Sequence, residues 1–393
     1  MKKNIALAIT IVLVVGAIIY LESTKAGPGA ATGNGSAQSI AVSPTTSNAG
    51  GAGTAGTSGS TQTALAAIAA ADRRAGHSPA LEIADPTGFV NATSGFNLAG
   101  LIGKKVILLD FWTYSCINCI RTIPYLDAWY QKYSNEGLEI VGIHTPEFDF
   151  EKQISNVQTA VAQYGIQYPV VLDSDYGTWT AYGNLYWPSE YLIDIAGYVV
   201  HNSIGEGNYA QTEAEIQQLL AQRDVALGLP NTVSSGTVNV AAANLNEIES
   251  PETYFGAERN QTLANGAQGE TGVQDLMLPT SDTTLNELYL GGKWDFESQY
   301  AMSEASGTTI LFQYDAGKVY FVAGAAQTTT IQVIQDGQPV GPGVAGSDVV
   351  SSTLTVGPNR LYNVINNASG GGGHTLELIV HQPGLQAFTF TFG

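Results

Sequence analysis

The chain has 393 residues, which is long enough for two or three domains. Only 12% of its residues are charged, and acidic residues outnumber basic ones by 34 to 15, which gives a net charge of -19. Because binding to the phosphates of nucleic acids requires a basic surface, this balance argues against a nucleic-acid partner.

The N-terminus starts with two lysines that precede an uncharged apolar run. Residues 5–21 read IALAITIVLVVGAIIYL. This run is slightly long for a signal-peptide core and just long enough for a short spanning helix. We therefore expect residues 1–25 to be an N-terminal membrane anchor or signal. The two lysines would stay on the cytoplasmic side of the membrane, so that the rest of the chain faces outside the cytoplasm. If the segment is cleaved, the chain is secreted.

A segment of low complexity follows the apolar run. Residues 26–63 consist mainly of Gly, Ala, Ser and Thr and offer very little apolar surface to bury. A chain of this composition cannot offset the entropy lost on folding. We therefore expect a disordered tether between the N-terminal segment and the first domain.

From residue 64 to 229, apolar runs alternate with segments of helical period. Val106–Trp112 (VILLDFW) is a continuous apolar run of the kind found in buried parallel strands. Residues 116–133 then place apolar side chains on one side of a helix. This order predicts an α/β fold with a central sheet. Further strands are expected at 138–143, 168–172, 190–194 and 198–202, and further helices at 151–164 and 213–223.

The pattern changes in the last part of the chain, residues 230–393. Short alternating runs recur about every ten residues and are separated by Gly-rich turns, such as residues 369–373. This spacing predicts an antiparallel β-sandwich. The expected strands lie at 308–314, 318–324, 330–335, 360–366, 374–380 and 387–392.

Cys116 and Cys119 are the only cysteines of the chain, and they follow the predicted strand in the stretch DFWTYSCINC. A helix that starts at or next to Cys116 favours its thiolate, because helix N-termini carry partial positive charge and free N–H groups. Cys119 lies one turn later, where it can attack a mixed disulfide on Cys116. The spacing predicts a nucleophile and a resolving thiol.

Other roles for the pair remain open. A structural disulfide is compatible with a location outside the cytoplasm, although so small a loop adds little stability. A zinc site needs four ligands, and the sequence has no second CxxC pair, so we expect no metal. Two inert core cysteines are the third alternative.

The stretch VILLDFWTYSCINCIRTIPYLDAWYQKY resembles the active-site region of extracytoplasmic thioredoxin-like proteins, above all the C-terminal part of DipZ-type proteins. The resemblance continues through GLEIVGIHTPEFDFEK and PSEYLIDIAGYVV. It implies a thioredoxin-like α/β fold over residues 64–229, followed by an all-β, jelly-roll-like sandwich. The multi-helix membrane module of DipZ-type proteins has no counterpart in this chain, which leaves the electron donor or acceptor unidentified.

The resemblance also implies roles for single residues. Asp110 matches the buried acid of the thioredoxin motif and would accept the proton of the second cysteine. Glu147 falls where TlpA-like thioredoxins place an acid near the cysteines. Together with Cys116 and Cys119, these two acids are the candidate catalytic residues.

Four further residues are implied to form the substrate-binding surface. Pro188 matches the cis-proline opposite the active site in thioredoxin folds, so the Trp187–Pro188 bond is expected to be cis. Trp112 and Tyr114 are expected to shape the surface around the cysteines, or to be packing residues.

The C-terminal part resembles the sandwich that follows thioredoxin in DipZ-type proteins, which is similar to carbohydrate-binding jelly rolls. The resembling stretches are PETYFGAERNQT and NELYLGGKWDFESQY. A glycan site would need an exposed aromatic platform with polar neighbours. Tyr254 and Trp294 are the candidate platforms and Arg259 the polar partner, unless both aromatics belong to the core.

These observations predict a membrane-tethered thiol-disulfide oxidoreductase that acts on protein disulfides or thiols. The redox-active Cys116–Cys119 disulfide would serve without any cofactor. Two alternatives are a thiol peroxidase of the peroxiredoxin class and a surface glycan-binding protein with a structural CxxC.

Overall fold

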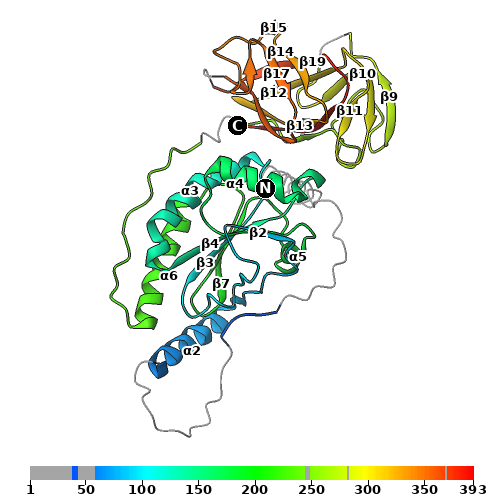
Figure 1. Cartoon of the computed structure of the whole chain (residues 1–393). Coiled ribbons are helices and arrows are strands. Elements are labelled where there is room, and N and C mark those ends of the chain that lie inside the picture. The colour runs from blue at the N-terminus through cyan, green and yellow to red at the C-terminus, as the bar shows by residue number, and fades with distance from the viewer. Residues whose placement is uncertain (1–37, 43–57, 244–247, 281–282, 368–369) are drawn as a thin grey trace, which may run out of the picture. The chain divides into compact units, whose positions relative to one another are not determined.

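A computed structural model describes residues 38–42, 58–243, 248–280, 283–367 and 370–393. The chain forms two compact units, Met1–Val240 and Ala241–Gly393 (Figure 1). The predicted N-terminal anchor, residues 1–25, and most of the predicted tether lie outside the described residues. Within the described ranges, no helix combines the length and apolarity needed to cross a membrane.

The first unit is built on a seven-stranded sheet in the order β1-β7-β6-β3-β4-β5-β2. The three strands β3, β4 and β5 are parallel, whereas β6 runs antiparallel to β3. The strands are β1 (Ser78–Pro79), β2 (Gly88–Val90), β3 (Val106–Trp112), β4 (Leu138–His144), β5 (Val170–Leu172), β6 (Ser189–Ile193) and β7 (Tyr198–Ile204).

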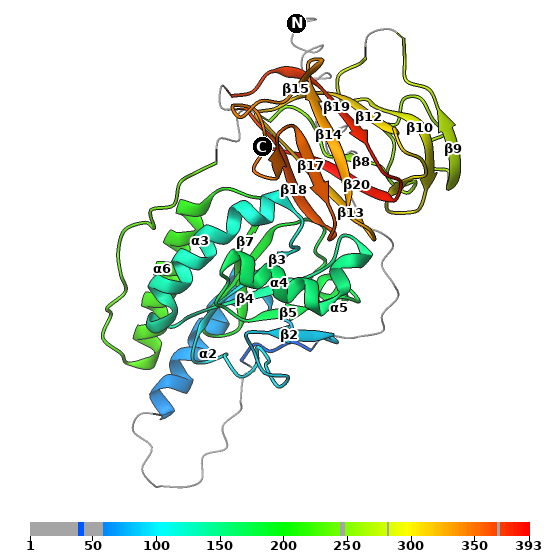
Figure 2. The ribbon, with the colours of Figure 1, turned by 45° about the horizontal axis from the view of Figure 1, so that its top comes forward.

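Helices cover both faces of this sheet (Figure 2). One core cluster joins one face of the sheet to α3, α4 and α6, and a second joins the other face to α5. The helices are α2 (Ser58–Ala75), α3 (Ile117–Tyr133), α4 (Ile154–Tyr164), α5 (Gly177–Ala181) and α6 (Tyr209–Leu227). The sheet with covering helices is the thioredoxin-like fold that the sequence predicts.

Strand β3 lies at the centre because all seven of its residues are buried. Its side chains alternate between the two clusters, so that Leu108 and Trp112 pack toward α3, and Leu109 and Phe111 pack on the opposite side. Asp110 is therefore on the α3 side of the sheet, in an otherwise apolar stripe. Strand β3 thus places the carboxyl group of Asp110 between the sheet and α3, the helix at whose start the cysteines lie.

Both ends of the first unit extend beyond its predicted elements. Helix α2 begins at Ser58, inside the range expected to be a tether. At the other end, the carbonyl of Gly236 accepts hydrogen bonds from Lys132 and Gln217, and the N–H of Val238 donates to Glu213. These contacts join residues 234–240 to α3 and α6.

The second unit is all-β, as predicted, and its strands pair antiparallel. A single buried cluster of aliphatic and aromatic side chains forms its core. The strands are β8 (Thr253–Tyr254), β9 (Gly272–Leu276), β10 (Leu288–Phe296), β11 (Ala301–Ser303), β12 (Thr309–Asp315), β13 (Lys318–Ala325), β14 (Thr329–Gln335), β15 (Gln338–Pro339), β16 (Val349–Val350), β17 (Thr353–Val356), β18 (Arg360–Asn366), β19 (Gly373–Val380) and β20 (Leu385–Phe392).

Strand β10 connects the two halves of this unit. Its first part, up to Gly291, pairs with β12, whereas its second part, from Gly292 onward, pairs with β9 and β11. Gly292 has a φ of 82°, which residues with a side chain adopt only at a cost. The glycine lets one strand change partners and close the sandwich over its core.

The structure corrects the predicted glycan platform of the second unit. Trp294 is fully buried in the core and donates its indole N–H to the carbonyl of Gly291 at 3.0 Å. It faces inward because the second half of β10, from Lys293 to Phe296, alternates between more exposed and buried side chains, so it cannot present a ring to a sugar. The guanidinium of Arg259 lies 3.8 Å from the ring centre of Tyr254 and covers one face of that ring.

Candidate active site

The two cysteines lie where β3 ends and α3 begins. Cys116 is the N-cap of α3, and its sulfur accepts a hydrogen bond from the backbone N–H of Cys119 at 3.3 Å. Cys116 is 9% exposed and Cys119 is 1% exposed. The first thiol is therefore the more accessible of the two and receives an N–H donor of the first helical turn, as the spacing predicts.

Cys119 faces the buried acid of β3. Burial raises the pKa of its thiol above the ordinary value, and the negative charge of Asp110 adds to the shift. Asp110 is 1% exposed, and burial also raises the pKa of its carboxyl group well above the usual range. The structure thus places an acid with a raised pKa beside the thiol of Cys119.

A second buried carboxyl group lies next to Asp110 on the neighbouring strand. Glu190 on β6 is the antiparallel partner of Asp110 and is 4% exposed. Burial raises the pKa of Glu190 to about 8, and its charge is the second cause of the raised pKa of Asp110. Asp110 therefore belongs to a pair of acids, of which the sequence analysis identified one.

Glu147, the other predicted acid, lies in the turn after β4 and is partly exposed. Its backbone N–H donates to Oε2 of Glu151 at 2.6 Å, and Glu151 is the fully buried acid of this turn. Glu151 belongs to the 3-10 helix Asp149–Lys152. The buried carboxylate next to the cysteine loop is thus Glu151.

Glu151 connects this turn to Ser115, the residue before Cys116. Its Oε1 accepts a hydrogen bond from the hydroxyl of Ser115 at 2.6 Å and one from the Ser115 N–H at 3.3 Å. Its Oε2 also accepts the N–H of Phe148 at 2.9 Å. Burial raises the pKa of Glu151 to about 7, and the nearby charge of Glu147 adds to the shift. The carboxylate fixes the loop that leads into Cys116.

The sequence left two roles open for Trp112 and Tyr114, shaping the surface around the cysteines or packing. The structure shows packing. Trp112 is fully buried and Tyr114 is 4% exposed. Both rings pack against His144, at centroid distances of 5.2 Å and 5.7 Å. Burial lowers the pKa of His144 to about 3, so this ring is neutral at physiological pH. The three rings pack together next to the loop that leads into Cys116.

The Trp187–Pro188 bond is cis, as predicted from the sequence. The indole N–H of Trp187 donates to the carbonyl of Thr145 at 3.0 Å, next to the end of β4. Trp187 is partly exposed, and its ring lies 4.3 Å from that of Trp179. Trp187 is thus available at the surface, whereas Pro188 is buried.

An ion pair links the segment between the cysteines to the loop after β7. Arg121 donates to both carboxylate oxygens of Glu206, at 2.8 Å and 2.5 Å, and to the side-chain oxygen of Asn118 at 2.7 Å. The next residue back, Gly205, donates its N–H to the carbonyl of Pro188 at 2.8 Å. The pair therefore fixes the helix start relative to the cis-proline.

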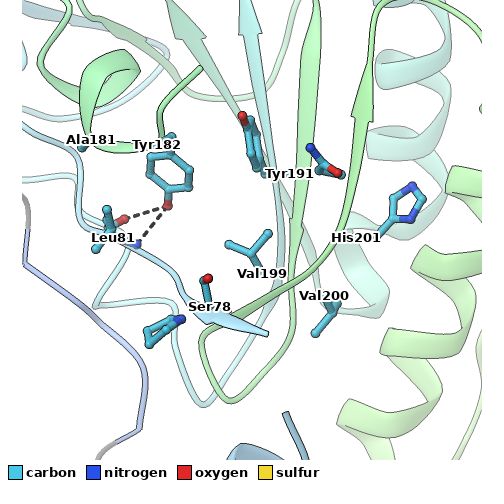
Figure 3. A pocket seen from close by; sticks show the side chains of 10 residues that line it. Ser78, Leu81, Ala181, Tyr182, Tyr191, Val199, Val200 and His201 are labelled. Carbon is cyan, nitrogen blue, oxygen red and sulfur yellow. Dashed lines mark hydrogen bonds between the residues drawn. The ribbon is translucent and has the colours of Figure 1, made fainter. Parts of the chain in front are cut away.

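A cavity of about 690 Å³ lies elsewhere in the first unit, next to β1 and β7 (Figure 3). The Tyr182 hydroxyl bridges the N–H and the carbonyl of Leu81 at its wall. Neither cysteine and none of the acids described above lines this cavity. Among the described residues, no three His, Cys, Asp or Glu side chains gather as a metal site would require.

Comparisons with known proteins identify matches to both units of the chain. Residues 82–202 match the AhpC/TSA family, and residues 250–393 match the thioredoxin like C-terminal domain. Protein DipZ of Mycobacterium bovis is 38% identical over 319 residues, which cover 78% of this chain and 42% of DipZ. The chain thus spans less than half of that relative.

Two further matches each cover about a third of the chain. Thiol-disulfide oxidoreductase ResA of Bacillus thuringiensis is 32% identical over 133 residues, which cover 32% of this chain and 74% of ResA. The crystal structure of the thioredoxin-like superfamily protein SPOA0173 is 26% identical, with a TM-score of 0.33, and the match covers 36% of this chain and 96% of that one.

Sequence reasoning missed Glu151 and Glu190 for different reasons. Glu151 stands at the start of a segment with helical period, where an acid is ordinarily a solvated first-turn residue. Glu190 lies within β6, two residues after the cis-proline. A charged residue in a strand that is otherwise buried was a signal that could have found it.

We expect Glu151→Gln to remove part of the pH dependence of stability. The pKa of Glu151 is raised from 4.5 to about 7 in the folded protein. Between these values the folded protein binds a proton that the unfolded chain has released, so the free energy of unfolding falls as pH rises. For this carboxyl group the fall amounts to about 3 kcal/mol.

Urea denaturation at pH 5, 6 and 7 measures this effect as the difference between wild type and variant. Asp149→Asn is the matched control, because Asp149 lies in the same 3-10 helix and its side chain is 71% exposed. Equal pH slopes for wild type and Glu151→Gln would show that Glu151 does not titrate in this range.

Proposed function

Because the chain belongs to the thioredoxin-like thiol-disulfide oxidoreductases, we propose that it exchanges disulfides with exported proteins through Cys116 and Cys119. The observation that carries the proposal is the asymmetry of the pair. One thiol caps the start of α3 near the surface, and the other is buried above an acid. An exchange needs these two environments, because one sulfur must attack a substrate and the other must resolve the product.

The exchange has two steps. The Cys116 thiolate attacks a substrate disulfide, its bond to one substrate sulfur forms, and the other substrate sulfur leaves with the electron pair. Cys119 then attacks the Cys116 sulfur, closes the Cys116–Cys119 disulfide and releases the second substrate thiolate. The substrate disulfide is reduced by two electrons and the cysteine pair is oxidised, and the steps reverse when the protein donates its disulfide.

Asp110 accepts the proton that Cys119 loses in the second step. Its charge acts on the Cys119 thiol, and its raised pKa makes it a stronger base than an exposed aspartate. Glu147, the alternative acceptor, has its electrostatic effect on Glu151. We therefore assign the proton transfer to Asp110.

Replacement of the cysteines tests the assignment of the two steps. Cys119→Ser should accumulate a stable mixed disulfide between Cys116 and a protein substrate such as insulin, because the resolving thiol is absent. Cys116→Ser should form none, and both variants should lose at least about 100-fold in insulin reduction. Mass spectrometry of the trapped adduct identifies the sulfur involved.

The same experiment separates the alternatives. A wild-type protein that does not reduce insulin, with an unreactive Cys116–Cys119 disulfide, would indicate a structural staple. Rapid peroxide consumption with a sulfenic acid on Cys116 would indicate a thiol peroxidase instead. An adduct on Cys119 in the Cys116→Ser variant would reverse the assigned roles.

The proposed setting is the outer face of a cytoplasmic membrane. The charge-free run at residues 5–21 after two lysines supports an anchor with the remaining chain outside. The proposed partners are protein disulfides or thiols and a separate electron donor or acceptor.

Removal of residues 1–25 tests the anchor. We expect the full chain in the membrane fraction, resistant to extraction by high salt, and the shortened chain in the soluble fraction with unchanged insulin reduction. A full chain that fractionates as a soluble protein would contradict the anchor, unless its N-terminus proves to be cleaved on sequencing.

A further inference from the structure

Glu190 stands in direct register with Asp110, the proposed proton acceptor. The two residues are antiparallel partners on β6 and β3, so their side chains point to the same face of the sheet with Cβ atoms about 5 Å apart. Both side chains are buried. Oδ1 of Asp110 and Oε2 of Glu190 are inaccessible to solvent and have no hydrogen-bond partner among the described residues.

In the part of the chain that the structure describes, no positive charge pairs with the two carboxyl groups. Neither forms an ion pair with any described residue, and Arg121 at the start of α3 is bound to Glu206. The polar and titratable groups that share this face come from three elements, α3, β7 and α6, and from the segment before β5. They are Cys119 and Asp127 on α3, Tyr168 before β5, Ser203 and His201 on β7, and Tyr209 and Thr212 on α6.

We propose that Asp110 and Glu190 share one proton, and that Glu190 is a positioning residue that keeps Asp110 ready to accept the proton of Cys119. Two carboxylates in one buried site cannot both be ionised without a counter-charge, so the pair retains a proton that an isolated acid would release. The inference rests on the proposed disulfide exchange, and it adds the residue that tunes the acceptor.

The shared proton sets the protonation of Asp110 and Glu190 before Cys119 resolves the mixed disulfide. With one proton present, one carboxylate remains free to take the proton of the Cys119 thiol. The Cys119 sulfur then bonds to Cys116, the substrate sulfur leaves with its electron pair, and the pair returns a proton to that thiolate. Oxidant and reductant are the substrate disulfide and the two cysteines, as in the proposed function.

The electrostatics of the pair agree with this geometry. Burial raises the pKa of Glu190 to about 8, and the nearby Thr212 hydroxyl opposes the shift. Burial and then the charge of Glu190 raise the pKa of Asp110. Because each carboxylate opposes ionisation of the other, the two groups titrate as a unit with two macroscopic steps.

Glu190→Gln tests the proposal, because it keeps the shape and removes the charge. The reduced full chain is mixed with an aromatic disulfide that releases one coloured thiolate on attack by Cys116 and a second on resolution by Cys119. Removal of Glu190 lowers the pH at which Asp110 ionises. We therefore expect the pH midpoint of the second phase to fall by about one unit or more.

Glu139→Gln is the matched control. Glu139 is a half-buried acid at the start of β4, and burial raises its pKa as well, yet it pairs with Ile107 rather than with Asp110. Its variant should keep the wild-type midpoint. A midpoint in Glu190→Gln equal to those of wild type and Glu139→Gln would overturn the proposal.

A double variant shows whether Glu190 acts through Asp110. In the Asp110→Asn background, Glu190→Gln should produce no further shift of the midpoint, because the group that it tunes is absent. A shift of equal size in both backgrounds would mean that Glu190 acts on Cys119 without Asp110, which contradicts a positioning role.

A titration of the wild-type protein keeps the proposal testable if Glu190→Gln does not fold. Carbon NMR of the Asp110 carboxyl group should show two steps, one for each macroscopic ionisation of the pair. A single step would overturn the shared proton. A wild-type protein that fails to exchange disulfides contradicts the proposed function, whereas this titration still decides whether the pair exists.

Discussion

The candidate active site depends on one constraint: two carboxyl groups are buried on one face of the sheet, and neither forms an ion pair with a described residue. Asp110 and Glu190 occupy neighbouring buried strands, and Cys119 lies near them in the first turn of α3. Each of these groups is costly to ionise in this place, because the side chains are buried and no cation of the described residues forms an ion pair with them. Burial therefore raises the pKa of all three groups.

The surrounding fold keeps the two thiols in different environments. The end of β3 and the N-terminus of α3 bring Cys116 toward the surface, and Glu151 holds the preceding Ser115 through its hydroxyl and N–H groups. The Arg121–Glu206 pair then fixes the start of α3 relative to the loop that bonds to Pro188. The Cys116 sulfur is thus positioned by contacts from three segments that are distant in the sequence.

The sequence predicted what is local and missed what depends on register. The VILLDFW run identified β3, and the two cysteines at its end identified the site, because both are signalled by neighbouring residues. Glu190 is opposite Asp110 only because β6 pairs with β3, and no pattern within either strand specifies that pairing. Trp294 likewise reads as an exposed ring or as core, and only the alternation of β10 decides in favour of the core.

The most direct test is a pH titration of both thiols in the reduced protein. Carbon NMR of the labelled cysteine Cβ atoms monitors the ionisation of each thiol. The account predicts that Cys119 is the last of the two to ionise and remains protonated above pH 8.5, the ordinary value for a cysteine being about 8.5. Ionisation of Cys119 at or below that value, or before Cys116, would contradict the buried acidic environment from which the whole account proceeds.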